Sequence, residues 1–247
     1  MLRIPSADPR AASLVTAIHR GDVAALERQF ASDPELANAR IVDKRGTERT
    51  LLLVVADWPG HFPNGAATVA ALVKAGADVN APFVPAGSPG APETPLHWAA
   101  SSDDVEVLDA LLNHGADIEA PGAVFTGGPA MSDAVVFAQW TCARRLLERG
   151  ATTTIWQAAA LGLLERVQQF CEAEPAPTAQ DITNALWHGC RGGQLAVAQF
   201  LIERGGDRNW VGYDMKTPVD ASRDSGNKEL VRWLVSLGQT RRTATRE

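Results

Sequence analysis

The side chains of this sequence that could do chemistry are a few imidazoles and carboxylates spread widely along the chain. If the fold brings these side chains together, they could ligate a metal ion or act as an acid and a base. The residues are His61, His97, His188, Asp57 and Asp133. Their spacing does not group them, and Cys190 lies only two positions from His188, so the two project to different sides of a helix. The glycine-rich phosphate loops, the HExxH and GxSxG motifs and the EF-hand loop are absent from the sequence. These observations favour a non-enzymatic protein with no cofactor and no metal site.

A segment of unusual composition stands between two predicted helices. Residues 51–56 form an aliphatic run, and the next helix carries Val69 and Leu72 at helical spacing. The eight residues from 57 to 64 include two aromatics, an imidazole and a carboxylate, a composition rarely needed only to turn a corner; the side chains are Asp57, Trp58, His61 and Phe62. Two interpretations are open. The aromatic side chains pack back onto neighbouring helices while His61 is solvated, or the segment folds toward a binding surface and lines it.

The composition argues against several classes of function. The chain of 247 residues has a formal net charge of −6, and its basic residues occur only in short, scattered clusters, which disfavours a nucleic-acid-binding face. Its three cysteines form no CxxC pair, as expected for a reducing compartment. No apolar run is long enough to span a bilayer, and the N-terminal residues lack the apolar stretch of a signal peptide. We expect a soluble cytoplasmic protein with no nucleic-acid or membrane partner, and the alanine- and arginine-rich, lysine-poor composition indicates a bacterial source.

A repeated pattern organises the elements that must position these residues. Its clearest copy reads Thr-Pro-Leu-His-Trp-Ala-Ala at 94–100, followed by a polar break, a second helix from Val105 and Gly-Ala-Asp at 115–117. Degraded copies recur along the chain, and each predicted second helix ends at a glycine that favours a left-handed cap; these glycines are Gly76, Gly115, Gly150, Gly205 and Gly238. The interval between Gly150 and Gly205 is long enough to contain one more repeat, ending near Pro175.

This pattern resembles the ankyrin repeat family, whose repeats of ~33 residues carry Thr-Pro-Leu-His-x-Ala and two short helices. The resemblance implies an all-α solenoid of about seven helix-turn-helix units joined by short β-turn fingers. We predict a single ankyrin-repeat domain over 1–238 and a polar tail at 239–247, with repeats near 11–40, 44–80, 91–120, 123–151, 152–178, 179–210 and 211–238.

The resemblance also implies where to look for function. In the family, the histidine at the position of His97 ties adjacent turns together by hydrogen bonds, and partners bind a concave groove formed by the finger tips and the first helices. The position after this histidine is often leucine, but here it is Trp98, Asp133 and His188 in three different repeats. With the inserted segment and a neighbouring tryptophan, these residues make the predicted binding groove: Asp57, Trp58, His61, Phe62, Trp98, Asp133, Trp187 and His188.

Three functional hypotheses follow. The leading one is a scaffold that binds a protein or peptide partner through the groove, with specificity from the elongated turn at 81–93 and the insertion at 57–64. The alternative is a small-molecule binding protein or an enzyme, whose pocket is formed by the insertion with Trp98, Asp133 and His188. A third, an inhibitor resembling an antitoxin or immunity protein, fits the acidic charge but has no sequence motif of its own.

Overall fold

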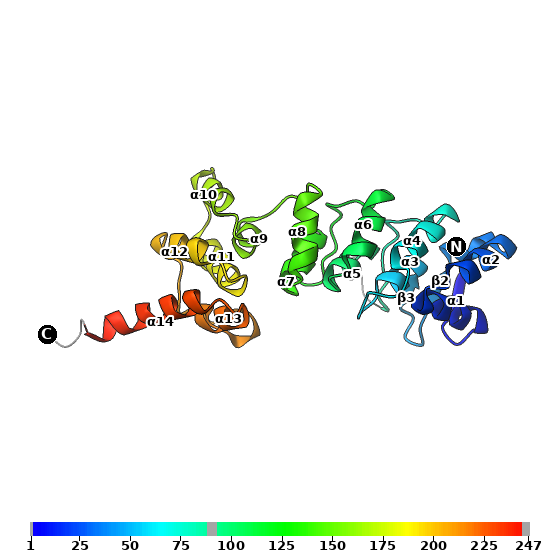
Figure 1. The fold of residues 1–247 in the computed structure, drawn as a ribbon, viewed down its shortest axis with the longest axis horizontal. Helices are drawn as coiled ribbons and strands as arrows, with labels where there is room; N and C mark the ends of the chain where they lie inside the picture. The colour runs from blue at the N-terminus through cyan, green and yellow to red at the C-terminus, as the bar shows by residue number, and fades with distance from the viewer. Residues whose placement is uncertain (1, 88–92, 244–247) are drawn as a thin grey trace. The chain divides into compact units, whose positions relative to one another are not determined.

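Helices dominate the fold. A computed structural model of the chain describes residues 2–87 and 93–243, and within these ranges it contains fourteen α-helices (Figure 1). The helices follow one another as seven pairs, joined by short turns except that the 57–64 segment separates α3 from α4, which confirms the predicted all-α solenoid of about seven units. The chain divides into two compact units, Met1–Ala151 (unit 1) and Thr152–Glu247 (unit 2). The prediction of one domain over 1–238 stays a prediction.

Unit 1 contains four helix pairs. Its helices are α1 (Pro9–Arg20), α2 (Val23–Ser32), α3 (Leu51–Ala56), α4 (Gly65–Lys74), α5 (Pro95–Ser101), α6 (Val105–Asn113), α7 (Ala130–Val136) and α8 (Trp140–Glu148). The first helices of successive pairs pack on one another, α1 on α3, α3 on α5 and α5 on α7, while the second helices pack in a parallel row. Each pair buries its apolar face only against its neighbours, as in other solenoids.

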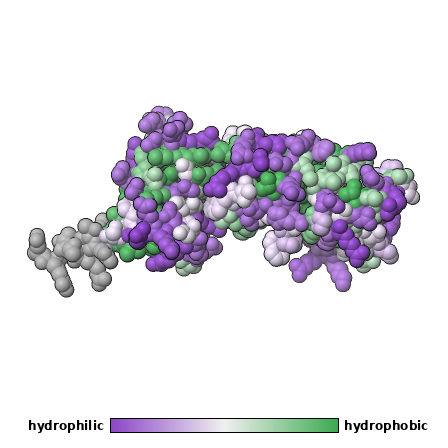
Figure 2. Space-filling model, viewed as in Figure 1, coloured by the Kyte–Doolittle hydropathy of each residue, from purple (hydrophilic) through white to green (hydrophobic). Residues whose placement is uncertain are grey.

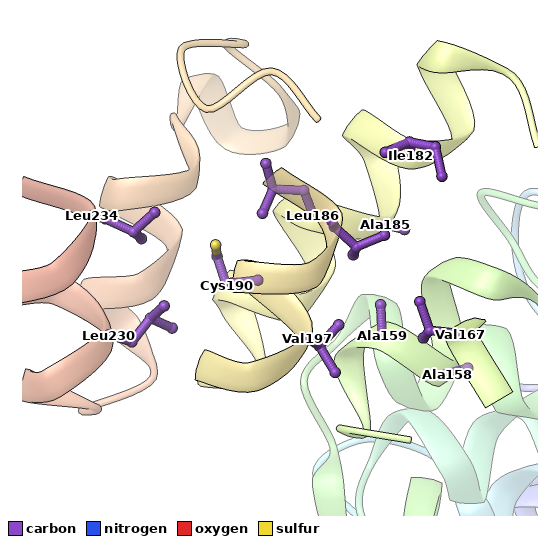
Figure 3. Close-up of a cluster of buried hydrophobic side chains, with 12 residues drawn as sticks. Ala158, Ala159, Val167, Ile182, Ala185, Leu186, Cys190, Val197, Leu230 and Leu234 are labelled. Carbon is purple, nitrogen blue, oxygen red and sulfur yellow. The ribbon is translucent and has the colours of Figure 1, made fainter. Parts of the chain in front are cut away.

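Unit 2 contains three helix pairs. They are α9 (Ile155–Ala160) with α10 (Leu164–Glu172), α11 (Ala179–Arg191) with α12 (Leu195–Glu203), and α13 (Pro218–Asp224) with α14 (Lys228–Thr243). Helix α11 packs against α9 and α13 and supplies Leu186 and Cys190 to the buried core, where Leu230 and Leu234 of α14 also lie (Figure 3). Small residues such as Ala158 and Ala159 are fully buried in this core, which lets neighbouring helices approach closely.

The turns between repeats form the fingers, and one of them is a strand pair. Strand β2 (Arg40–Val42) runs antiparallel to β3 (Glu48–Thr50), and β1 (Arg3–Pro5) pairs with β2 in parallel. Further along the chain, asparagine side chains join successive fingers. Asn80 donates to the carbonyl of Gly115 and accepts from the amide of Asp117, and Asn38 does the same one repeat earlier with residues 76 and 78.

Most of the predicted helix ends are confirmed. Gly76, Gly115, Gly150 and Gly205 all have φ between +90° and +97°, the left-handed conformation that only glycine adopts without strain. Gly238 is different, because α14 continues through it to Thr243, so its prediction as a repeat end is wrong. The first part of the predicted tail at 239–247 thus continues a helix, and its last residues, 244–247, lie outside the described residues, as do residues 88–92 of the elongated turn.

Helix α11 begins at Ala179, where the repeat near 179–210 is predicted to begin, because Thr178 and Asp181 form a capping box there. Within the described residues, none of the helices combines the length and apolar composition that a membrane span requires.

Candidate functional site

Exposed apolar side chains gather on the fingers. Nine large hydrophobic residues are exposed in the described part of the chain, and six of them lie in the fingers that precede α5, α7 and α13. On the face shown in Figure 2, hydrophobic residues lie in patches among hydrophilic ones. We call the exposed residues before α5 and α7 the unit 1 finger surface, which comprises Val84, Val124 and Phe125. The residues before α13 form the unit 2 finger surface, which comprises Val211, Tyr213 and Met215.

The finger before α7 is held in place by hydrogen bonds at its base. The amide of Ala123 donates to the carbonyl of Gly128 over 2.9 Å, which leaves Val124 and Phe125 at the tip. The Phe125 side chain is 71% exposed, and its ring lies 5.9 Å from that of Phe137 at the end of α7. The finger thus presents an aromatic side chain beside a first helix.

Behind the unit 1 finger surface lies a buried carboxyl group. Asp133 on α7 is only 1% exposed, and neither of its carboxyl oxygens has a hydrogen-bond partner. Burial, with a smaller contribution from the nearby charge of Glu93, raises the pKa of Asp133 to about 7, although the backbone of Val124 favours the ionised form. Asp133 is therefore close to half ionised at neutral pH.

Glu93, whose charge acts on Asp133, lies at the base of the preceding finger, and Trp98 follows it on α5. The amide of Phe83 donates to the carbonyl of Glu93 over 2.8 Å, which closes that finger just before α5. The Phe83 and Trp98 rings are 5.3 Å apart, and the Trp98 side chain donates a hydrogen bond to the Glu93 carboxylate. Burial still raises the pKa of Glu93. We call Phe83, Glu93, Trp98 and Asp133 the carboxyl cluster.

In unit 2, aromatic rings surround a buried imidazole. His188 on α11 is 4% exposed, and its ring lies 4.6 Å from that of Trp156, 5.0 Å from Trp187 and 5.5 Å from Tyr213. Its Nδ1 has no hydrogen-bond partner. Burial, assisted by the charge of Arg191, lowers the pKa of His188 to about 3, so the imidazole is neutral at physiological pH.

Trp187, which the sequence analysis places in the binding groove, is a buried residue of α11. Its side chain is fully buried, and its indole N–H donates to the carbonyl of Lys216 over 2.9 Å. The indole therefore holds the unit 2 finger by a hydrogen bond from the buried side. Tyr213 is the aromatic side chain that reaches solvent, because it is 51% exposed, and its ring lies 5.2 Å from that of Trp187.

His97 has the structural role that the resemblance implied. Its Nδ1 accepts from the Thr94 amide over 3.2 Å within the capping box of α5, and its Nε2 lies 3.2 Å from the carbonyl of Gly128 in the next finger. Both ring nitrogens are thus engaged, which ties two successive repeats together. His97 thus caps α5 and hydrogen-bonds to the next finger, whereas the Nδ1 atom of His188 has no hydrogen-bond partner.

The inserted segment at 57–64 lies against the turns between paired helices. Phe62 stacks on His19 at 4.3 Å, and the His61 amide donates to Asp104 over 2.6 Å. Asp57 pairs with Arg49 at 2.5 Å, and Trp58 is 79% exposed. Asp104 follows the C-terminal end of α5, whereas Trp98 contacts residues at the finger before α5. Participation of this segment in a binding surface stays a prediction.

The predicted groove residues therefore separate into groups with different surroundings. Trp98 and Asp133 share Glu93 as a neighbour, Trp187 and His188 belong to the aromatic cluster, and the 57–64 side chains contact the helix-to-helix turns. Asp133 belongs to unit 1 and His188 to unit 2. Glu93 and Tyr213 were missed because both lie in fingers, outside the columns of the repeat that drew attention to the other residues.

Paired helices stacked in sequence order, with fingers tied across repeats, define the class of helical solenoids. Residues 93–123 match the family model described as Ankyrin repeat. The solved ankyrin repeat domain of human ASB11 superposes with a TM-score of 0.50 at 18% sequence identity, covering 90% of this chain and 96% of that one. The chain is an ankyrin-repeat protein.

Two curated nematode proteins are similar in sequence. The ankyrin repeat and KH domain-containing protein mask-1 of Caenorhabditis elegans is 27% identical over 143 residues, and CBG24701, the protein of the same description from Caenorhabditis briggsae, is 27% identical over 142 residues. Each alignment covers 58% of this chain and 5% of the nematode protein, so the chain spans a small part of these relatives. Ankyrin repeats are generally protein–protein interaction modules.

Proposed function

We propose that this chain binds a protein or peptide partner through its finger surfaces and the adjoining sides of the first helices, which form the groove of an ankyrin stack. The observation that carries the proposal is the placement of six of the nine large hydrophobic residues that are exposed in the described part of the chain, which lie on the fingers. Exposed apolar groups gathered on one kind of element typically mark an interaction site, because leaving apolar surface exposed to water is unfavourable and a partner can cover it.

Aromatic anchors supply the binding energy in this proposal. Phe125 and Tyr213 are exposed but already supported by neighbouring rings, so little side-chain freedom is lost when a partner covers them. A pocket that joins the 57–64 segment to Asp133 and His188 is not favoured, because the segment packs on other turns and the two side chains belong to different units. The free thiols of the three cysteines fit a cytoplasmic scaffold.

Quantitative capture from a lysate of the source organism tests this function. The wild-type chain identifies the partner by mass spectrometry, and the Phe125→Ala and Tyr213→Ala variants are then compared with it. Each is expected to weaken binding roughly tenfold or more, as truncation of an aromatic anchor does. The matched control is Val235→Ala, which truncates an exposed apolar residue on α14 and is expected to bind like the wild type. Equal capture by the wild type and both finger variants would contradict the proposal.

A further inference from the structure

Asp133 is the exception among the buried carboxylates of unit 1. Glu48 lies between Arg3 and Arg40, and Asp104 accepts hydrogen bonds from the amides of Val107 and His61. Both groups are therefore compensated within the fold. Asp133 is more deeply buried than Glu48, yet it forms no ion pair within the described residues, and only the backbone of Val124 favours its ionised form.

A stable fold does not need this carboxyl group. The equivalent first-helix position holds Val54, Ala158 and Ala221 in other repeats, and all three are buried. An ionised group that is buried without a partner costs several kcal/mol in general. Retention of an aspartate at an apolar position indicates that a partner for it comes from outside the described residues.

The surroundings of Asp133 define the chemistry of that partner. Glu93 adds a second carboxyl group, and within the described residues no lysine or arginine contributes to the electrostatic environment of either acid. Trp98 and Phe83 add aromatic rings beside the acids. Carboxylates next to aromatic faces attract a cation, through hydrogen bonds to the oxygens and through the negative faces of the rings.

We propose that the carboxyl cluster binds one arginine side chain of the protein partner. The inference rests on the proposed function, since it assumes a protein partner at the unit 1 finger surface. Glu93 and Trp98 are partly exposed, so the partner's arginine contacts them first, and Asp133, which is 1% exposed, is reached only when the side chains that cover it move. Arginine fits better than lysine because its planar guanidinium donates to two acids at once and stacks on an indole ring, whereas an ammonium group is compact and strongly hydrated.

A titration monitored by NMR tests the site in the full chain. The probe is N-acetyl-arginine methylamide, and the signal is the indole N–H of Trp98, assigned with Trp98→Phe. We expect a saturable shift in the millimolar range, and no shift with the uncharged isostere N-acetyl-citrulline methylamide. Glu93→Gln and Asp133→Asn are each expected to weaken binding about tenfold. Glu106→Gln, which removes an exposed charge from α6, is the matched control and should bind like the wild type.

The outcomes separate this inference from the proposed function. Equal shifts with the citrulline probe, or unchanged affinity in both acid variants, would overturn the site. Tighter binding of the corresponding lysine probe would overturn the choice of arginine. If Asp133→Asn loses its dispersed indole spectrum, Glu93→Gln still tests the site, because Glu93 is only partly buried. If the chain does not bind the arginine probe but capture of the partner still depends on Phe125, the arginine site is refuted and the proposed function stands.

Discussion

At the scale of the residue, the position after the Thr-Pro-Leu-His histidine shows what a polar substitution does in a packed column. Asp133 and His188 were recognised from the sequence because leucine, valine or alanine is expected there. Both are buried, and burial shifts the pKa of each toward its neutral form. The sequence could not reveal whether either had a hydrogen-bond partner, since that depends on fingers whose paths the repeat pattern does not determine.

Asp133 makes the stability of unit 1 depend on pH. The folded chain holds a proton on this carboxyl up to a pKa of about 7, whereas the unfolded chain releases it near the ordinary value of 3.8. The unfolded state therefore binds fewer protons between these values, so this group reduces stability as pH rises from about 4 to 7. The full effect is on the order of 4 kcal/mol, because each unit of pKa corresponds to about 1.4 kcal/mol.

The Asp133→Asn variant should remove this dependence. We expect it to be more stable than the wild type at pH 8 and to differ little near pH 4, because an amide cannot ionise. Chemical unfolding at both pH values, with hydrogen exchange of α7 as the local measurement, provides the comparison. Asp109→Asn, which removes a carboxylate on the surface of α6, is the control. Parallel pH profiles for the wild type and Asp133→Asn would show that the carboxyl is not protonated as described.

At the scale of the element, the caps were the most predictable feature. The glycines that end α4, α6, α8 and α12 were identified because a left-handed residue is needed where each helix stops. The prediction at Gly238 was wrong because this glycine lies inside α14, which continues to Thr243. The start of α11 at Ala179 has its own signal in the sequence, the Thr178-x-x-Asp181 capping box.

The His97 side chain should contribute to stability through two elements at once, the cap of α5 and the finger before α7. His97→Ala is expected to destabilise the chain by about 1–3 kcal/mol, because it removes the cap and the hydrogen bond to the partly buried Gly128 carbonyl. His97→Gln should cost less, since Gln157 forms the equivalent cap at the start of α9. Urea unfolding measures both, with His114→Ala, an exposed histidine, as the control. Equal stability of His97→Ala and His114→Ala would refute the tie.

At the scale of the whole molecule, the sequence predicted the solenoid but not which side chains are exposed on its fingers. The helical periodicity is set by burial between neighbouring repeats, which leaves a strong pattern, whereas the fingers vary in length and carry no period. Glu93, Phe125 and Tyr213 therefore went unnoticed, although each unit presents exposed aromatic or apolar residues on a finger. The inserted segment drew attention by its composition, yet its contacts are with the helix-to-helix turns.

Site-specific photocrosslinking tests the central claim, that partners bind at the fingers, most directly. A photoreactive phenylalanine analogue is placed at position 125 or 213, and at position 106 or 235 as controls on the second helices. Position 58 reports separately on the inserted segment, because Trp58 is exposed. The account predicts adducts with the captured partner from positions 125 and 213 and none from positions 106 and 235. Adducts from the second helices, with none from either finger, would contradict it.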